Sequence, residues 1–402
     1  MQWTPQQDGA LKAVAQWMKD PSQQVFRLMG YAGTGKTTLA RHLAEGVSGR
    51  VMFGAFTGKA AHVLRLRGCP GASTIHSMIY YSGEASKKRL RELELELADL
   101  LTRLGPEARD PRIGILEEAV RVERLNAQRP IFSLNPDSDV RGASLVVIDE
   151  CSMVDDKMGE DLLSFGAKVL VLGDPAQLPP VKGSGGFFTE GSPDVMLTDI
   201  QRQARDNPII ALATTVREGR RLEPGAWGSS EVLAAGSRLA PESVVSAGQV
   251  LVGKNATRHM YNRRMRQILG RTDALPEEGD KLVCLRNNHD LGLLNGGLWQ
   301  ARSTLPDGDT VMMTISSLDM PGVDLDVLAH QGHFLGQEVP WWDRKDAEEF
   351  DYGYAMTVHK SQGSQWEDVL ILDESRVFRD DWARWLYTAV TRAQERVRVL
   401  LT

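Results

Sequence analysis

The feature that most constrains this chain is an eight-residue phosphate-binding motif near its N-terminus. Gly30-Tyr31-Ala32-Gly33-Thr34-Gly35-Lys36-Thr37 matches the pattern GxxxxGK[ST] in full. An apolar run from Val25 to Met29 precedes it, and a helical pattern with Leu39 and Leu43 on one face follows it. The motif requires this strand–loop–helix context. We therefore predict a nucleoside triphosphate site rather than a chance glycine-rich turn.

The residue types of the motif suit phosphate binding. Glycines let backbone N–H groups turn toward phosphate oxygens, and the N-terminus of the following helix favours negative charge. Lys36 supplies a positive charge for the β- and γ-phosphates, and the Thr37 hydroxyl is a ligand for Mg²⁺. The expected cofactor-binding residues of the loop are Gly30, Gly33, Thr34, Gly35, Lys36, Thr37 and Thr38.

A second element, an apolar strand with an acidic end, would act together with this loop. The apolar segment from Leu145 to Ile148 predicts a buried strand, and it ends in Asp149 and Glu150. Ligands of open α/β sheets bind at the carboxyl ends of the strands. We expect Asp149 to hold Mg²⁺ and Glu150 to orient or deprotonate the attacking water. An acidic strand end alone is common, so this assignment depends on the phosphate loop upstream.

Two arginines are candidates for stabilising the charge of the transition state. Arg202 follows Leu197 to Gln201, and Arg392 ends the segment that begins at Tyr387. An arginine placed on the γ-phosphate raises the rate by about 10³–10⁵-fold. Taken alone, either arginine is typical of a surface salt bridge.

Strand and helix patterns alternate through most of the chain, which predicts an α/β fold with a parallel sheet covered on both faces. Residues 82–139 interrupt this alternation. There, leucines recur at spacings of three and four, and a weaker helical pattern runs from Ile113 to Leu125; the leucines are Leu90, Leu93, Leu97, Leu100 and Leu104. We predict a helical hairpin, with a solvated pair of packing helices as the plain alternative to a special role.

A second interruption covers residues 276–349. Lys281 to Leu285, Thr310 to Ser316 and Val323 to Leu328 read as short strands between turn residues, which predicts a small all-β insertion. No stretch approaches the length of a membrane-spanning segment, and the N-terminus does not resemble a signal peptide. The three cysteines form no CxxC pair, which fits a reducing cytoplasm. The net charge of −6 argues mildly against a general polyanion binder but allows a local basic groove.

Taken in order, these segments resemble the motifs of superfamily 1 helicases of the RecD-like/Dda-like branch. The matches run from residue 4 to residue 393. They are Phe56–Ala61 with motif Ia, Ser73–His76 with motif Ib, Asp149–Met153 with motif II, Gly173–Pro180 with motif III, Arg202 with the arginine of motif IV, Thr357–Ser364 with motif V and Tyr387–Arg392 with motif VI.

The resemblance implies an ATP-dependent DNA helicase that translocates 5′→3′ on single-stranded DNA, with two RecA-like cores sandwiching ATP. It implies catalytic roles for Lys36, Glu150 and Gln177 of the first core and for Arg202 and Arg392 of the second. Gly363 is a further expected cofactor-binding residue. Gln7 matches the glutamine that reads adenine, and it is also placed as the N3 member of a capping box begun at Thr4. Both roles stay open.

The resemblance also implies a single-strand groove and the layout of the chain. The residues expected to face DNA are Thr57, Lys59, His76, Thr357, His359, Lys360 and Ser361, with a structural role as the alternative for the two histidines. The expected domains are a first core at 1–81 and 140–200, the helical insertion at 82–139, a second core at 201–275 and 350–402, and an SH3-like barrel at 276–349.

The expected setting is a cytoplasmic monomer that meets single strands, strand–duplex junctions and single-strand-binding, replication or recombination proteins. Relatives of this branch carry a β-hairpin pin in the first insertion, whereas this insertion reads as helical, with strand pattern only near residues 130–134. A single-strand translocase, or a motor subunit of a recombination or repair complex without autonomous unwinding, is therefore the second reading. A non-enzymatic DNA-binding scaffold is the third, and it is opposed by the intact Lys36, Asp149, Glu150, Arg202 and Arg392. An RNA substrate stays open.

Overall fold

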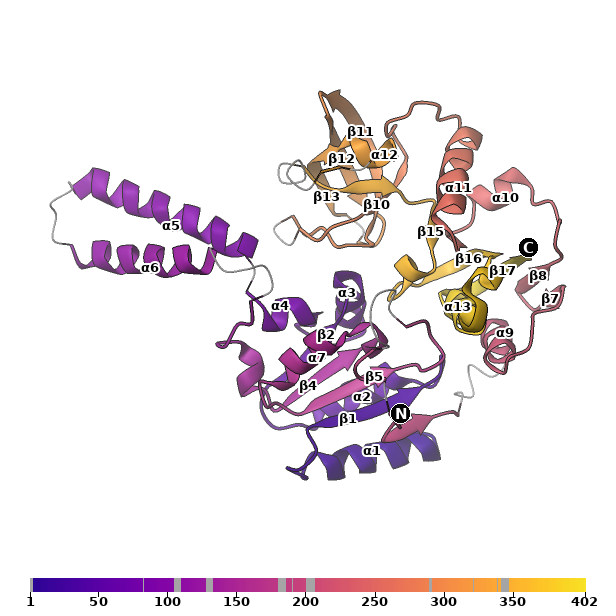
Figure 1. The fold of residues 1–402 in the computed structure, drawn as a ribbon, viewed down its shortest axis with the longest axis horizontal. Coiled ribbons are helices and arrows are strands. Elements are labelled where there is room, and N and C mark those ends of the chain that lie inside the picture. Colours follow the sequence, from indigo (N-terminus) through magenta and orange to yellow (C-terminus); the bar gives the residue numbers. More distant parts are fainter. Residues whose placement is uncertain are drawn as a thin grey trace.

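The structure is a computed structural model. It describes residues 3–81, 83–104, 110–127, 133–179, 186–189, 191–199, 207–288, 291–320, 322–337, 339–340 and 347–402. The chain forms two α/β bodies, a projecting pair of helices and a β-sheet body that lies above the first α/β body and beside the second (Figure 1). None of the helices in these ranges combines the length and the apolar run that crossing a bilayer requires.

The first α/β body is built on a six-stranded parallel sheet, in the order β3-β2-β4-β5-β1-β6. Its strands are β1 (Val25–Gly30), β2 (Val51–Ala55), β3 (Ser73–Thr74), β4 (Leu145–Asp149), β5 (Val169–Gly173) and β6 (Val195–Leu197). Its helices are α1 (Pro5–Trp17), α2 (Lys36–Glu45), α3 (Gly58–Leu66), α4 (Ile75–Ile79) and α7 (Asp156–Leu163). The α/β fold with a parallel sheet that the sequence predicts is confirmed.

Alternation along the buried strands explains why both faces of this sheet are covered. Leu145 and Val147 pack in one apolar cluster with residues of α1, α2 and α3. Val146 and Ile148 pack in a second cluster with residues of α4 and α7. Successive side chains of a strand point to opposite faces, so a wholly apolar strand needs helices on both sides.

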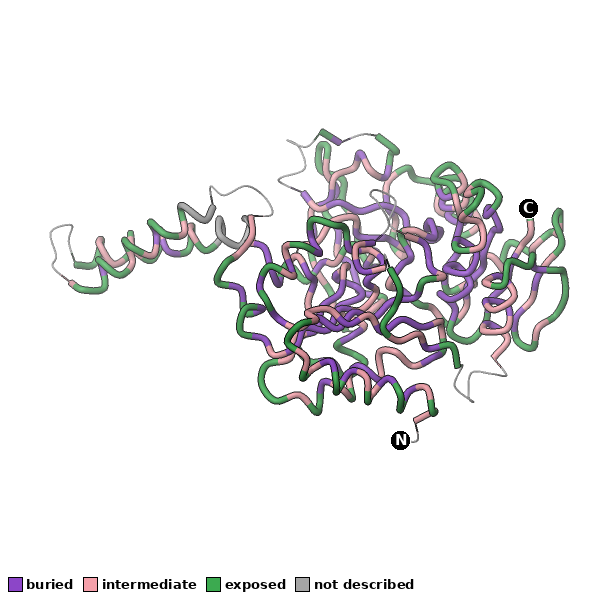
Figure 2. The backbone as a smooth tube through the Cα atoms, turned by 60° about the horizontal axis from the view of Figure 1, so that its bottom comes forward, coloured by how far each residue is buried: buried purple, intermediate pink, exposed green. Residues whose placement is uncertain are grey.

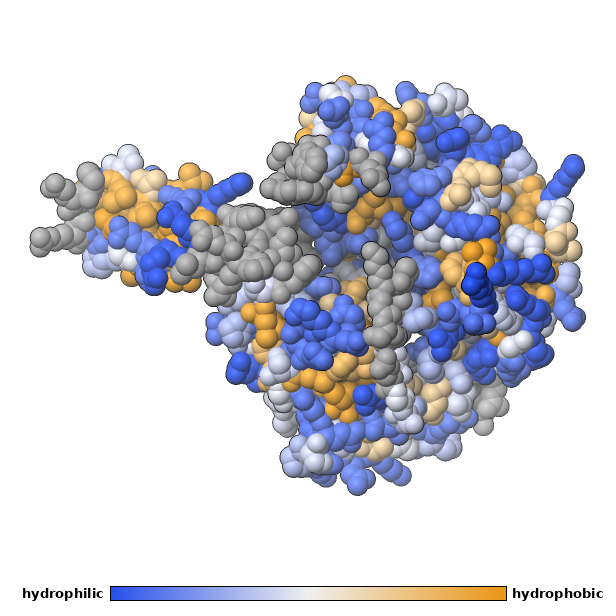
Figure 3. Space-filling model, viewed as in Figure 1, coloured by the Kyte–Doolittle hydropathy of each residue, from blue (hydrophilic) through white to orange (hydrophobic). Residues whose placement is uncertain are grey.

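Helices α5 (Gly83–Leu104) and α6 (Pro111–Ala127) leave the first body after α4 and project from it as an antiparallel pair (Figure 1). Leu93, Ile113 and Val120 are buried in this pair. Leu95 and Ile115 are largely exposed, and apolar side chains are visible on the outer surface of the two helices (Figure 3). The expected strand pattern near 130–134 lies mostly outside the described residues, although Leu134 forms one antiparallel bridge with Tyr80.

The second α/β body contains a six-stranded sheet in the order β15-β9-β16-β17-β8-β7, parallel except for the β7–β8 pair. Its strands are β7 (Gly225–Trp227), β8 (Ser230–Leu233), β9 (Gln249–Val252), β15 (Ala355–Thr357), β16 (Trp366–Asp373) and β17 (Ala393–Leu401). Its helices are α9 (Pro208–Arg217), α10 (Pro241–Val245), α11 (Asn255–Ile268) and α13 (Trp382–Val390). Buried residues concentrate in the two α/β bodies (Figure 2).

The β-sheet body is an antiparallel sheet in the order β13-β12-β11-β10-β14, with the short helix α12 (Gln331–Phe334) after β13. Its strands are β10 (Lys281–Cys284), β11 (Leu298–Asp307), β12 (Thr310–Ser317), β13 (Asp324–His330) and β14 (Phe350–Tyr352). A bridge between Ala329 and Glu348 brings the chain before β14 against β13, so the two edges of the sheet meet.

The β-sheet body and the second α/β body share one apolar core. Trp299 and Phe350 of the β-sheet body belong to the same cluster as Val250 of β9 and Met265 of α11. The sequence places residues 350–402 in the second core, but Phe350–Tyr352 pairs with β10 and so continues the β-sheet body. The pattern of these three residues suits a strand in either sheet, and only the pairing partner decides between them.

Candidate nucleotide and DNA site

The phosphate loop joins β1 to α2 and takes its shape from two glycines. Gly33 and Gly35 have φ near +80°, a conformation that other residues adopt only at an energetic cost. The Lys36 ammonium folds back over the loop and donates hydrogen bonds to the carbonyls of Gly30 at 2.6 Å and Tyr31 at 3.0 Å. The charge of Lys36 is therefore held inside the loop, where phosphate oxygens would lie.

Gln7 contacts this loop and also caps α1. Its side-chain oxygen accepts from the Thr4 N–H at 3.0 Å, and the Thr4 hydroxyl accepts from the Gln7 N–H at 3.2 Å, which completes the expected capping box. Its side-chain nitrogen donates to the carbonyl of Thr34 at 2.9 Å. The Thr34 side chain is fully buried and donates to the Tyr31 carbonyl. The adenine-reading role of Gln7 stays a prediction.

The acidic end of β4 faces the loop. The Thr37 hydroxyl donates to Asp149 at 2.9 Å, so the two expected metal ligands are already neighbours. Glu150 has φ of 54° and ψ of 44°, and apart from Arg379 it is the only non-glycine residue with positive φ in the described ranges. Such strain concentrates at functional sites, and Glu150 lines the cleft beside the phosphate loop.

The electrostatics of Glu150 suit a proton acceptor. Burial raises the pKa of its carboxyl, Arg392 opposes this rise, and the neighbouring charge of Asp149 adds to it. A carboxylate with a raised pKa is a better base toward water near neutral pH. Both carboxylates line a cleft of about 520 Å³ together with Lys36.

Gln177 and Arg392 also line this cleft. The side-chain oxygen of Gln177 is buried and has no hydrogen-bond partner among the described residues, which fits an acceptor aimed at a bound molecule. Arg392, two residues after the end of α13, enters from the second body and is held by the carbonyls of Thr388 and Ser364. Arg202, the other expected arginine, lies outside the described residues.

Tyr387 links the two bodies directly at the nucleotide cleft. Its hydroxyl accepts from the Ala32 N–H of the phosphate loop at 2.9 Å and donates to Asp174 at 2.7 Å. Burial, and then the charge of Asp174, raises the pKa of the hydroxyl, so it stays protonated. The sequence places Tyr387 in motif VI without a role, because no pattern reveals which residue of the other body it meets.

Three further contacts cross the same boundary. Leu178 packs in the apolar core of the second body, its N–H donates to the Thr388 hydroxyl and its carbonyl accepts from Gln362, both at 2.9 Å. The Arg217 guanidinium of α9 lies 3.7 Å from the centre of the Tyr31 ring. The phosphate loop and the segment after β5 are therefore both in contact with the second body.

Among the expected DNA-facing residues, Lys59 is engaged within the protein. Its side chain is only 8% exposed, and its ammonium lies 3.0 Å from Asp319, which follows β12. The same ammonium lies 5.1 Å from the centre of the Trp366 ring. The ion pair therefore connects the first body to the β-sheet body.

Thr57, Gly363 and His76 also have protein neighbours. The Thr57 hydroxyl caps α3 by accepting from the Ala60 N–H, and Gly363 packs so closely on α3 that a Cβ there would lie 3.0 Å from the Cβ of Ala60. Gly363 does not line the 520 Å³ cleft but an adjoining cavity of about 280 Å³ that also borders Glu150. The His76 ring contacts Phe56, and burial lowers its pKa.

The motif V segment presents one exposed cation. Thr357 and Ser361 are buried, and the Ser361 hydroxyl donates to the Val358 carbonyl. The His359 ring packs against Phe378, and burial lowers its pKa. Lys360 is exposed, and partial desolvation together with the nearby Arg258 lowers the pKa of its ammonium. Of this segment, Lys360 is thus the residue best placed to meet a phosphate.

Comparisons with known proteins cover both α/β bodies. Residues 2–231 match the AAA domain family, and residues 352–400 match the UvrD-like helicase C-terminal domain. The chain is 29% identical over 391 residues to the ATP-dependent RecD2 DNA helicase of Deinococcus radiodurans, which covers 92% of this chain and 46% of that protein. It is 26% identical over 433 residues to the RecD subunit of the RecBCD enzyme of Mycobacterium tuberculosis, covering 94% of this chain and 67% of that protein.

Solved structures show the same fold. A Bacteroides Pif1 helicase in complex with ADP-AlF3 and single-stranded DNA gives a TM-score of 0.52 at 18% identity, covering 99% of this chain and 92% of that one. Pif1 helicase from Candida albicans gives a TM-score of 0.53 at 17% identity, covering 100% of this chain and 94% of that one. This chain spans about half the length of its RecD2 relative.

Proposed function

Because the chain belongs to the RecD/Pif1-like helicases of superfamily 1, we propose that it is an ATP-dependent motor that moves 5′→3′ on single-stranded DNA and unwinds duplex DNA. One observation carries the proposal. Lys36 and Glu150 of one body and Arg392 of the other line a single cleft. A cleft built from two bodies changes shape when they move, and this links ATP hydrolysis to motion.

The side chains of the cleft divide the hydrolytic chemistry among them. Lys36 neutralises charge on the β- and γ-phosphates, and Glu150 orients the attacking water and accepts its proton. Arg392 stabilises the charge that develops on the γ-phosphate, and the free oxygen of Gln177 accepts a hydrogen bond from the attacking water. Thr37 and Asp149 are the residues that would hold Mg²⁺, which neutralises phosphate charge when bound.

The contacts between the two bodies transmit the state of the cleft. Tyr387 is hydrogen-bonded both to the phosphate loop and to Asp174. Leu178 is hydrogen-bonded to Thr388 and Gln362 of the second body. A change in the phosphate loop on binding or hydrolysis therefore biases the second body between two positions. The second body carries the β-sheet body with it, because they share a core.

We propose the following domain layout for this motor. The first core consists of residues 1–81 and 140–200, and the second core of residues 201–275 and 353–402. The helical insertion is 82–139 and the barrel is 276–352. The end of the barrel is moved from residue 349 to residue 352 so that it includes β14. Single-stranded DNA would run over both cores past Lys59 and Lys360. Junctions and single-strand-binding, replication or recombination proteins are the proposed partners.

Strand displacement on matched duplexes with a 5′ tail, a 3′ tail or no tail tests the proposal, with Glu150→Gln as the inactive control. We expect ATP-dependent displacement of only the 5′-tailed duplex. Displacement of only the 3′-tailed duplex would show that the proposed direction of translocation is wrong. Absence of ATPase stimulation by single strands would remove the motor function altogether.

A single-strand translocase without autonomous unwinding is the second candidate, and the helical insertion favours it. In the described part of residues 82–139 the insertion consists of α5, α6 and short turns, with no β-hairpin to split a duplex. This candidate predicts ATPase activity that rises with single strands, while none of the three duplexes is displaced. Addition of a partner protein would then restore unwinding.

Tyr387→Phe is expected to lower the turnover of the DNA-stimulated ATPase about tenfold while the KM for ATP changes little. The substitution keeps the packing of the ring but removes the hydrogen bonds to Ala32 and to the charged Asp174, and bonds to charged groups are the stronger ones. Steady-state kinetics and the number of ATP molecules used per displaced strand measure the effect. Tyr261→Phe, at a half-buried tyrosine on α11, is the matched control, and equal effects of the two would refute a coupling role.

Asp319→Asn is expected to tighten single-strand binding about 2- to 5-fold at low salt, because the Lys59 ammonium is released from its ion pair. The logarithmic salt dependence of the affinity should steepen by about 0.7, the value for one more phosphate contact on a single strand. Fluorescence anisotropy of a labelled oligonucleotide measures both quantities. Asp307→Asn, at the exposed β11–β12 turn, makes the same charge change elsewhere on the barrel, and an identical gain there would point to net charge alone.

A further inference from the structure

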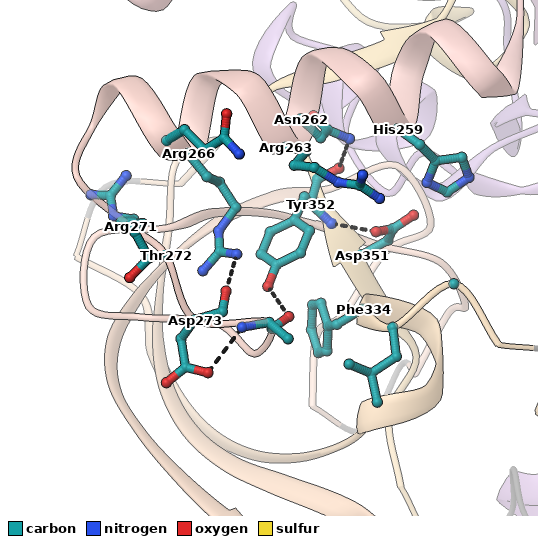
Figure 4. A pocket seen from close by; sticks show the side chains of 14 residues that line it. His259, Asn262, Arg263, Arg266, Arg271, Thr272, Asp273, Phe334, Asp351 and Tyr352 are labelled. Carbon is teal, nitrogen blue, oxygen red and sulfur yellow. Dashed lines mark hydrogen bonds between the residues drawn. The ribbon is translucent and has the colours of Figure 1, made fainter.

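A second large cavity lies away from the nucleotide cleft, between α11 and the β-sheet body. It has a volume of about 630 Å³. Figure 4 shows one wall formed by α11, with His259, Asn262, Arg263 and Arg266, and the other by Phe334, Tyr352 and the segment around Asp273. None of the residues predicted from the sequence to bind nucleotide or DNA lines this cavity.

The charge on α11 contrasts with the rest of the chain. Residues 255–268 contain four arginines and no carboxylate, in a protein whose net charge is −6. A helix surface of one sign in an acidic protein concentrates positive potential locally and attracts anions.

The four arginines of α11 fall into two pairs with different surroundings. Arg258 and Arg266 are buried, and each is neutralised by a buried partner, Asp351 at 2.6 Å and Asp280 at 2.9 Å respectively. Arg263 and Arg264 are exposed, and neither forms an ion pair with any residue in the described ranges. The buried pair stabilises the fold, so the charge available to a ligand belongs to Arg263 and Arg264.

His259 lies one helical turn before Arg263 and adds a neutral donor. The Arg258 guanidinium lies 3.0 Å from the Nε2 atom of His259. A guanidinium only donates, so Nε2 accepts, and the neutral imidazole then carries its proton on Nδ1. Burial and then the charge of Arg258 lower the pKa of His259, which keeps the ring neutral. The two ends of the cavity differ, because Asp273 lies at the end away from His259 (Figure 4).

The cavity borders the expected DNA path. Asp351 lines the cavity, and both Asp351 and Arg258 act electrostatically on the exposed Lys360 of motif V. Asn262 of α11 is hydrogen-bonded to Ala355 at the start of β15, the strand that leads into motif V. Single-stranded DNA that passes Lys360 and continues along α11 therefore meets His259 and then Arg263.

We propose that the end of this cavity formed by His259 and Arg263 binds backbone phosphate of the single strand beyond Lys360, as an extension of the DNA groove. The proposal rests on the proposed function, because it needs a polynucleotide in the groove. The ligand is a phosphodiester rather than a base, since His259 and Arg263 at this end are hydrogen-bond donors, whereas Phe334 and Tyr352 are buried.

Binding of oligonucleotides of increasing length to the full chain tests the proposal, with Arg263→Ala as the variant. Wild-type affinity should rise with length until the track is filled. The variant should match the wild type on the shortest oligonucleotides and fall about 2- to 5-fold behind on longer ones. Its logarithmic salt dependence should be smaller by about 0.7 on the longer ones. Arg238→Ala, which removes an exposed arginine elsewhere in the second body, is expected to follow the wild type at every length.

A neutral methylphosphonate, placed at one linkage after another, locates the contact. One or two linkages should lower the affinity of the wild type but not that of Arg263→Ala, the pattern of a direct interaction in a double-mutant cycle. Equal affinity of variant and wild type at all lengths would overturn the proposal, as would an equal loss at all lengths. Competition by inorganic phosphate as strong as by oligonucleotide would overturn it in favour of a small-anion site. If the proposed function fails instead, the wild type itself binds no oligonucleotide.

Discussion

Glu150→Gln is expected to slow ATP hydrolysis by about 10²–10⁴-fold, the usual contribution of a general base, while ATP still binds. Glutamine has the size of glutamate but cannot accept the proton of the attacking water. The groups that hold the phosphates are unchanged, since Lys36 and Thr37 stand on the loop and α2. Single-turnover hydrolysis and equilibrium binding of a fluorescent nucleotide measure the two quantities separately.

The pH profile gives this prediction a second readout. Because burial raises the pKa of Glu150, wild-type hydrolysis should fall on the acid side at a pH above that of an ordinary carboxyl group. The base form is lost as the pH drops through this raised pKa, and the Gln variant should lack that acid limb. Glu160→Gln, on the exposed side of α7, is the matched control and should keep both rate and profile. Near-normal turnover of Glu150→Gln would remove Glu150 from its role.

Arg392→Ala should reduce turnover by about 10³–10⁵-fold, with a much smaller change in nucleotide affinity, because an arginine finger acts on charge that exists only in the transition state. Arg392 comes from the second body, while the phosphate loop and both carboxylates come from the first. In the Arg392→Ala variant, closure of the two bodies on ATP would therefore no longer bring a catalytic charge to the γ-phosphate. Pre-steady-state hydrolysis compared with nucleotide affinity measures the effect.

Folding must be separated from chemistry here, since Arg392 is only 3% exposed and is held by two carbonyls. Arg392→Lys keeps the positive charge and most of the side-chain volume but loses the planar set of guanidinium N–H donors. This variant should fold normally and still show a large part of the loss of turnover. Arg396→Ala, an exposed arginine four residues further on, should leave turnover unchanged. If Arg392→Ala weakened affinity and turnover equally, the finger role would be wrong.

Local patterns predicted those parts of the molecule whose physics is local. The GxxxxGK[ST] segment positions backbone, charge and hydroxyl within eight residues, and the apolar run before Asp149 and Glu150 specifies a buried strand that ends in acid. The capping box of Thr4 and Gln7 needs only a spacing of three, and the leucines at spacings of three and four lie in α5. In each case the interacting atoms are a few residues apart, so the sequence contains the whole interaction.

Contacts between distant segments were decided by the tertiary structure alone. Tyr387 meets Ala32 across 355 positions of sequence, and the choice of partner depends on how two separately folded sheets pack. Lys59 was expected to face DNA, yet its near neighbour is Asp319, delivered by an insertion that no motif describes. Phe350 carries a strand pattern that fits either of two sheets, and only the pairing with β10 assigns it. Arg263 is one of four arginines in α11. The fold places carboxylates beside Arg258 and Arg266 and leaves Arg263 exposed. The sequence therefore determined the chemistry that this chain carries, and the packing of its bodies determined which charges are neutralised and which remain free to bind.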